Sequence, residues 1–125
     1  MTQPTTGSFQ VDDIRDWRGH AVVDQNGDKI GTLEAIYYDT ASSAAAFASV
    51  QIGIVGRHRL TFVPLDGARV SPNHLRVLID KKTAKDAPTI DTDGELTAEQ
   101  EPDLFAHYGL AYTPGASGER RLGRR

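Results

Sequence analysis

The most regular alternation of apolar and polar positions in the chain lies at residues 46–54. Every second position there holds a small or branched apolar residue, namely Ala46, Ala48, Val50, Ile52 and Ile54. Successive side chains of an extended strand point to opposite faces of a sheet, so this period of two predicts one buried and one exposed face. We therefore predict a half-buried strand over this segment, with Ile52 in the core.

A turn sequence at residues 24–28 joins two further strand-like runs, at residues 20–24 and 29–39. At its centre lies Asn26-Gly27, and an Asn-Gly pair between two such runs is a strong hairpin signal because both residues tolerate the positive φ of a type I′ turn. Within residues 29–39 the apolar positions do not keep a strict period of two. We therefore predict a bulge at residues 32–35 that restores the register and curls the strand.

Three more short extended runs follow at residues 60–65, 68–71 and 75–79. Pro64 has no N–H for a strand ladder, so it must lie at a sheet edge or at a strand end. Before the first strand, residues 11–18 suit a single helical turn that would place Trp17 against the barrel mouth. Short strands at this spacing predict a barrel or sandwich. We predict a mainly β fold, a small closed or nearly closed antiparallel β-barrel over residues 11–80.

Beyond Asp80 the pattern changes from strands to a linker and a helix. Thr97 and Gln100 have the spacing of a capping box, and Gly109 stands where a helix ends in the left-handed conformation. Pro102 either occupies the first turn of this helix or bends it. We predict a linker and a helix that packs on the barrel at residues 81–112, a disordered arm at 1–10 and a disordered basic tail at 113–125.

Composition narrows the class of protein further. The 125 residues fit one domain, and the absence of cysteine excludes disulfides and thiolate metal sites. No apolar run at the N-terminus suggests a signal peptide or a membrane segment, so we expect a cytoplasmic protein. The net charge of −3 becomes −7 without the four arginines at residues 120–125. An acidic body is a poor binder of phosphates, which makes a nucleic-acid partner improbable for the folded part.

No cluster of residues predicts a reaction or a cofactor. Asp24, Asn26 and Asp28 alternate as in a calcium loop, but an EF-hand counted from Asp24 needs Gly and Glu where this chain has Lys29 and Ala35. The four histidines lie in different predicted elements, whereas a zinc site needs three or four convergent ligands. We expect no catalytic residues, no metal and no cofactor, and therefore not an enzyme.

One apolar stripe on the predicted C-terminal helix must be covered by the barrel or by a second copy of the chain. Covering by the chain's own barrel is the simpler alternative, while exchange between copies would also cover strand edges. We expect a homodimer and an additional protein partner of unknown identity. The candidate interface residues are Leu104, Phe105, Tyr108 and Tyr112.

Arg57, His58 and Arg59 form a local basic tip in a turn predicted at residues 56–59. This candidate site suits a phosphate or an acidic protein surface. The alternative is an ordinary solvated loop.

Several short motifs together, from about residue 12 to residue 112, resemble the PRC-barrel family, which is named for the cytoplasmic domain of the photosynthetic reaction-centre H subunit. They are Trp17-Arg18-Gly19, Asn26-Gly27-Asp28-Lys29-Ile30-Gly31, Tyr37-Tyr38-Asp39, Gly53-Ile54-Val55-Gly56 and Phe62-Val63-Pro64-Leu65. Downstream, Lys85-Asp86-Ala87-Pro88 and His107-Tyr108-Gly109-Leu110 look like free-standing bacterial members that append a helix.

This resemblance implies a docking or assembly module rather than a catalyst. A ribosome-associated or RNA-binding module is one alternative, because a ribosome-maturation factor is among the relatives. A soluble relative of the H subunit linked to photosynthetic electron transfer is another. An enzyme or small-ligand carrier that uses the barrel mouth near Trp17 would need a deep polar pocket.

Overall fold

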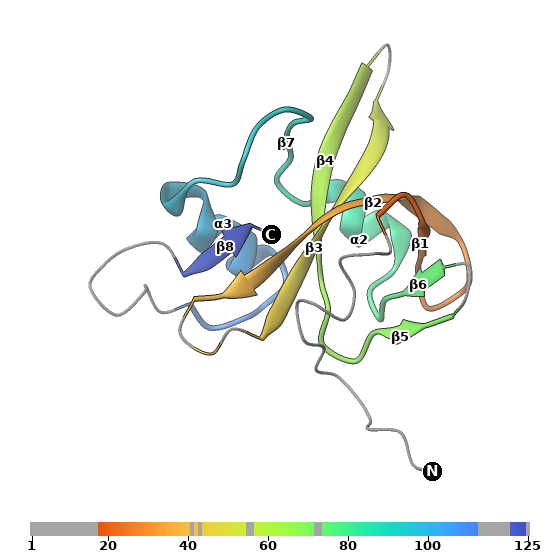
Figure 1. Cartoon of the computed structure of the whole chain (residues 1–125), viewed down its shortest axis with the longest axis horizontal. Helices are drawn as coiled ribbons and strands as arrows, with labels where there is room; N and C mark the ends of the chain where they lie inside the picture. Colours follow the sequence, from red (N-terminus) through yellow and green to blue (C-terminus); the bar gives the residue numbers. More distant parts are fainter. Residues whose placement is uncertain are drawn as a thin grey trace.

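The computed structural model describes residues 18–40, 42, 44–54, 57–71, 74–112 and 121–124. Within this part, the chain is mainly β with a helical C-terminal region, as predicted (Figure 1). The strands are β1 (Ala21–Val23), β2 (Lys29–Asp39), β3 (Ala45–Ile54), β4 (Arg57–Pro64), β5 (Arg69–Val70), β6 (His74–Arg76), β7 (Ile90–Asp91) and β8 (Leu122–Arg124). The helices are α2 (Lys81–Asp86), the 3-10 helix η2 (Ala98–Gln100) and α3 (Glu101–His107). The predicted arm at 1–10 and Trp17 lie outside the described residues.

All eight strands belong to one sheet, in the order β5-β6-β1-β2-β3-β4-β7, with β8 paired to β2. The pairs are antiparallel except β1 with β6, which is parallel. Among the described residues, β5 and β7 at the two ends of this order do not pair with each other, so the sheet is not closed. The fold class is the predicted one, and among the described strands the departures from it are the open sheet and the parallel pair of β1 with β6. Both end strands have only two residues, too few to close the ring.

The long strand β2 has the predicted irregularity. Its register against β3 shifts between Leu33 and Ala35, inside the segment predicted to bulge. At Gly31 a side chain would collide with the backbone of Gln51 and with Val50 in β3, so glycine is required for the two strands to approach. On one edge of β2, β1 pairs with positions 29, 31 and 32, and on the other edge β3 pairs with residues between 32 and 38.

The turn between β1 and β2 differs in detail from the predicted type I′ turn. Gly27 has a φ of 88°, and its N–H donates to the carbonyl of Asp24 at 3.0 Å. This bond makes Gln25 and Asn26 the central residues and places Gly27 after them, so the Asn-Gly pair is shifted by one position. The physical reason is the Asp24 carboxylate, which accepts the N–H groups of Asn26 and Asp28 and fixes this arrangement.

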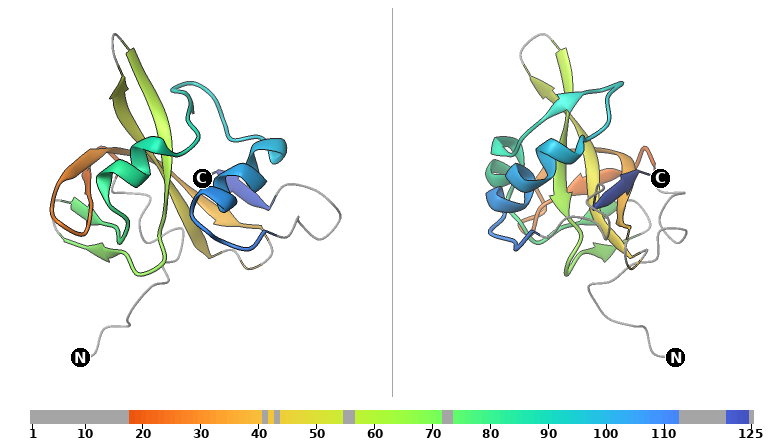
Figure 2. Two further views of the ribbon diagram at one scale, coloured as in Figure 1. Left: turned by 180° about the vertical axis from the view of Figure 1, so that it is seen from behind. Right: turned by 90° about the vertical axis from the view of Figure 1, so that its left-hand side faces the viewer.

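Strand β3 is buried on both faces over most of its length. Ile52 is only 3% exposed, as predicted, but Phe47 and Ser49 on the supposedly exposed face are buried as well. Two apolar clusters explain this. The first packs Ile52 with residues of β1, β2 and α2, and the second packs Phe47 with Leu104 of α3 and Leu122 of β8. Figure 2 shows α2 and α3 side by side against the long strands.

The C-terminal region contains more regular structure than predicted. The capping box is present, since Gln100 Oε1 accepts the N–H of Thr97 at 3.0 Å, and α3 begins at Glu101 with Pro102 in its first turn. Gly109 has the expected positive φ, 69°. The helix α2 and the strand β7 lie in the segment predicted as a linker. β7 pairs with β4, and α2 contacts β2 and β4, so both elements depend on contacts distant in sequence.

The end of the chain differs most from expectation. The residues 122–124, predicted to belong to a disordered basic tail, form strand β8 along the edge of β2. The reason is Leu122, a single apolar residue among arginines, which is 1% exposed in the second cluster. No helix in the described ranges is long and apolar enough to cross a membrane.

Candidate functional site

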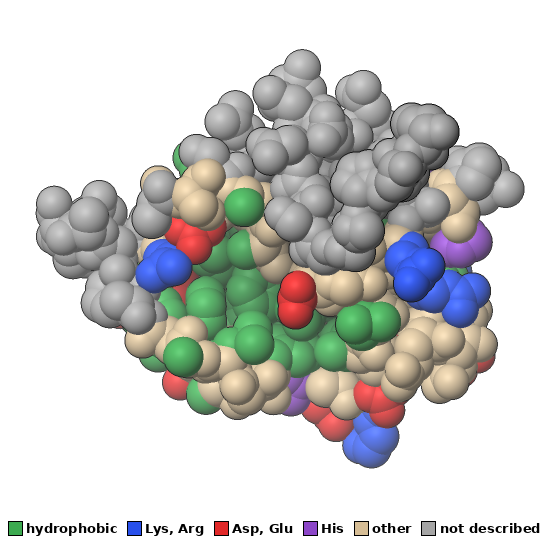
Figure 3. Space-filling view, turned by 90° about the horizontal axis from the view of Figure 1, so that it is seen from below, with side chains coloured by type: hydrophobic (Ala, Val, Ile, Leu, Met, Phe, Trp, Pro, Cys, Tyr) green, Lys and Arg blue, Asp and Glu red, His purple; other side chains and the backbone are tan. Residues whose placement is uncertain are grey.

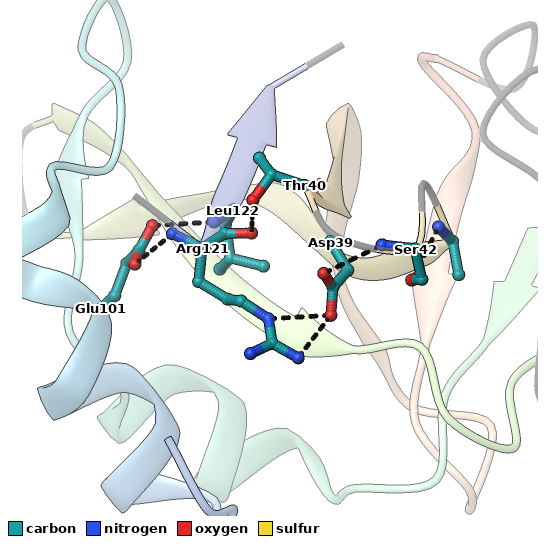
Figure 4. A network of polar contacts seen from close by, with 7 residues as sticks. Asp39, Thr40, Ser42, Glu101, Arg121 and Leu122 are labelled. Carbon is teal, nitrogen blue, oxygen red and sulfur yellow. Dashed lines mark hydrogen bonds and ion pairs between the residues drawn. The ribbon is translucent and has the colours of Figure 1, made fainter. Parts of the chain in front are cut away.

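The C-terminal strand is held at one edge of the sheet by a compact set of polar contacts. Strand β1 covers the edge of β2 only as far as Thr32, and β8 takes the same edge further on, with Leu122 opposite Asp39. Figure 4 shows polar side chains converging on β8 from β2 and from α3. We call this site the clasp, defined by Asp39, Thr40, Glu101, Tyr112, Arg121 and Leu122.

Glu101 is the centre of the clasp. Its side chain is fully buried at the start of α3, and its carboxylate accepts three hydrogen bonds. Oε1 accepts the Tyr112 hydroxyl at 2.7 Å and the Arg121 N–H at 2.8 Å, and Oε2 accepts the Leu122 N–H at 2.9 Å. Two of these donors are main-chain N–H groups of the C-terminal segment. The carboxylate therefore accepts N–H groups that a neighbouring strand would otherwise accept. Hydrogen bonds to charged groups are stronger than neutral ones.

Arg121 is fixed on its other side by the end of β2. Its guanidinium donates to Asp39 Oδ2 from Nε at 2.9 Å and lies 2.8 Å from the same oxygen at Nη2 (Figure 4). The main-chain carbonyl of Arg121 accepts the Thr40 N–H at 2.8 Å and the Thr40 hydroxyl at 3.0 Å. Asp39 therefore binds the side chain of Arg121, and Thr40 binds its backbone.

Two tyrosines, one in the clasp and one on the α3 side of it, have raised pKa values. The pKa of Tyr112 is raised to about 12, first by burial and then by the hydrogen bond to Glu101 and the charge of Glu101, against the lowering effect of Arg121. Burial also raises the pKa of Tyr108, whose hydroxyl donates to the Phe62 carbonyl at 2.5 Å. Both phenols stay neutral near pH 7 and donate hydrogen bonds.

A cleft of about 480 Å³ lies between the β1–β2 turn and α2, lined by three residues of the turn and five of the helix region. Asp24 ties its two sides together, because Oδ1 accepts the N–H groups of Asn26 and Asp28 and Oδ2 accepts the Lys81 N–H at 2.9 Å. Burial alone would raise the pKa of Asp24, but the hydrogen bonds from backbone N–H groups outweigh it and lower the pKa below 3.8. Within the described ranges, no group of His, Cys, Asp or Glu is arranged to hold a metal ion.

This geometry predicts a pH-dependent contribution of Asp24 to stability. Because the folded-state pKa is lowered, the contribution is complete above the ordinary pKa of 3.8 and is lost as the pH falls through the folded-state value. We expect Asp24→Asn to lower the free energy of unfolding at about pH 6, and the difference from wild type to shrink between about pH 4 and pH 2. Urea unfolding at several pH values measures it.

The matched control is Asp28→Asn, because Asp28 lies in the same turn with an exposed side chain. We expect this variant to unfold like the wild type at each pH. An Asp24→Asn deficit that is constant with pH would contradict the assignment.

The family of the chain follows from a comparison with known domains. A model of the PRC-barrel domain matches residues 9–84, more than half of the chain. The chain belongs to the PRC-barrel family. No curated protein matches its sequence. The matched part of this PRC-barrel protein ends within α2, so four of the six clasp residues, at positions 101, 112, 121 and 122, lie beyond it.

The structure places the candidate interface residues in contacts within their own chain. Leu104 is fully buried in the second cluster, and Tyr108 is held by its bond to the Phe62 carbonyl. The ring of Phe105 lies 5.4 Å from that of Phe47 and 5.0 Å from that of Tyr112, so α3 packs on the sheet of its own chain. The apolar stripe is therefore largely used within one molecule, which is the simpler of the two alternatives.

The three residues of the predicted basic tip differ in their surroundings. Arg57 and His58 are exposed at the end of the β3–β4 hairpin. Arg59 instead binds β7, because its guanidinium donates to Asp91 at 2.5 Å and to the Thr89 carbonyl at 3.0 Å. Only the first two residues of the tip thus face outward.

Sequence reasoning did not find the clasp. In the sequence, Glu101 is one acidic residue in the first turn of a predicted helix, and Arg121 is one of several arginines in a predicted tail. The one available signal was Leu122, an isolated apolar residue in a basic segment, which indicates a docked residue more than a solvated one.

Proposed function

We propose that this PRC-barrel protein is a non-enzymatic module that binds a protein partner and contributes to an assembly, as a cytoplasmic homodimer. Its β3–β4 hairpin is the observation that carries the proposal. Figures 1 and 2 show the ends of these two strands projecting away from the rest of the chain. In the described residues, β3 pairs with β2 only as far as Gln51, so residues 52–54 pair with β4 alone. Such a projecting arm with Arg57 and His58 at its end fits an acidic protein surface.

The use of buried polar groups supports binding rather than chemistry. Each of the four buried polar or charged side chains in the described ranges joins two segments of the fold. The Thr61 hydroxyl donates to the Ala84 carbonyl at 2.6 Å, and the Ser49 hydroxyl donates to Glu34 at 2.6 Å. Asp24 and Glu101 accept main-chain N–H groups, as described above. These groups are fully engaged in structural contacts.

An apolar surface on one face of the molecule also supports binding of a protein partner. Figure 3 shows hydrophobic side chains gathered in a hollowed area with charged side chains around it. Contiguous apolar patches with polar rims occur at sites of protein interaction. This surface supports the same proposal.

The test is affinity capture from a native lysate with a tag at the N-terminus of the full chain. We compare the wild type with the double variant Arg57→Glu/His58→Glu. The expected result is one or more specific proteins with the wild type, and about tenfold weaker binding, or ~1.4 kcal/mol, with the variant. The matched control is Arg69→Glu/Lys85→Glu, which reverses two exposed charges elsewhere and should leave the capture unchanged.

Other outcomes would replace the proposal. Recovery of RNA that ribonuclease removes would favour the ribosome-associated alternative, and recovery of reaction-centre proteins would favour the H-subunit alternative. A partner captured equally by all three proteins would exclude the hairpin tip as the contact.

A further inference from the structure

We propose that the clasp also accepts strand β8 from a second copy of the chain, so that two molecules exchange their C-terminal strands. This inference rests on the proposed role as an assembly module and names one of its partners as the chain itself. It also changes the expected dimer interface. The aromatic stripe of α3 is used within one molecule, whereas β8 is a segment that either copy can supply.

The contacts of β8 do not depend on the chain that supplies it. Glu101 lies 20 and 21 positions before the two main-chain N–H groups that it binds. Asp39 and Thr40 lie still further away, 82 and 81 positions before Arg121. Every one of these contacts joins the C-terminal segment to a distant part of the fold. The same segment of a second copy would meet identical donors, acceptors and register.

An empty clasp would expose groups that need a partner. Without β8, the Glu101 carboxylate would lose two of its three donors, and the end of β2 would present an unpaired strand edge. The site of Leu122 in the second apolar cluster would also be uncovered. Exposed strand edges are templates for pairing with another chain, and exchange of an identical element is a common route to dimers. The vacated site would therefore recruit the same segment.

Charge complementarity suits a second copy as the occupant as well as the chain's own segment. The segment at residues 120–125 carries four arginines, and the remainder of the chain carries a net charge of −7. Two chains therefore attract each other tail to body, and Asp39 supplies a carboxylate at the docking point.

The chain length also permits the exchange. Tyr112 and Arg121 bind the same oxygen of Glu101 when β8 docks in its own chain. The nine steps between these residues can span about 30 Å when extended, more than docking in the same chain requires.

The test uses the full chain at concentrations from low micromolar to millimolar. Sedimentation velocity measures the mass, and a mixed sample of ¹³C-labelled and unlabelled copies is examined by isotope-filtered NMR. Exchange predicts a dimer at high concentration and contacts between the Leu122 methyl groups of one copy and the Phe47 ring of the other. Leu122→Asp should abolish the dimer, while Leu110→Asp, at a 43% exposed leucine, should retain it.

Two results would overturn the proposal. One is a monomer throughout the concentration range. The other is a dimer that Leu122→Asp retains and that shows contacts from Leu122 within one copy only. A monomer would also remove the homodimer from the proposed function, but neither result affects capture of a partner by the β3–β4 hairpin, so failure of strand exchange and failure of the binding function are distinguishable. If Leu122→Asp does not fold, the filtered NMR experiment on the wild type decides alone.

Discussion

Glu101→Gln is expected to loosen strand β8 and to lower the free energy of unfolding, although glutamate and glutamine have the same number of non-hydrogen atoms. All three partners of the Glu101 carboxylate are donors, namely the Tyr112 hydroxyl and the N–H groups of Arg121 and Leu122. A glutamine amide must turn its NH₂ group toward at least one of them. A buried donor left without an acceptor costs about 1–3 kcal/mol. Urea unfolding measures the loss, and hydrogen exchange at the Leu122 amide reports the loosening of the strand.

The control for this prediction lies on the same helix. Asp103→Asn changes an exposed acidic residue in the first turn of α3 and should leave both measurements within the range of surface substitutions, about 0.5 kcal/mol. Equal behaviour of the two variants would contradict the role of Glu101 as the centre of the clasp.

The strands that sequence predicts well are those whose signals are local. The alternation at residues 46–54, the broken period in residues 29–39 and the glycine at the β1–β2 turn depend on neighbouring residues, and they correspond to β3, the bulge in β2 and the positive φ of Gly27. The start of α3 at Glu101 and its end before Gly109 also follow from local capping rules.

The parts that sequence did not predict depend on contacts distant in the chain. A period of two describes burial of one face, but Phe47 is buried on the other face because α3 and β8 cover it. A two-residue strand such as β7 has too few positions to show any period. It exists because Arg59 and β4 hold it.

The candidate site shows the same division. Arg57 and His58 are exposed, but they are the first paired residues of β4 and do not lie in the turn predicted at residues 56–59. The engagement of Arg59 with β7 required knowing where residues 89–91 lie in space. The clasp is the extreme case, because its two carboxylates come from Asp39 and Glu101 and its arginine comes from the end of the chain.

The largest loss of stability is expected from Phe62→Ala. The Phe62 ring is fully buried in the second apolar cluster, where it meets the ring of Tyr37 edge-on at 5.1 Å. Truncation of a buried phenylalanine costs about 3–5 kcal/mol, because the transfer free energy of the ring and the cavity both count. Since Leu104 and Leu122 share this cluster, the variant should also speed hydrogen exchange in α3 and β8. Phe62→Leu keeps most of the apolar volume and serves as the control, with a smaller loss expected in urea unfolding. A loss below about 0.5 kcal/mol for Phe62→Ala would show that this cluster does not hold the C-terminal elements on the sheet.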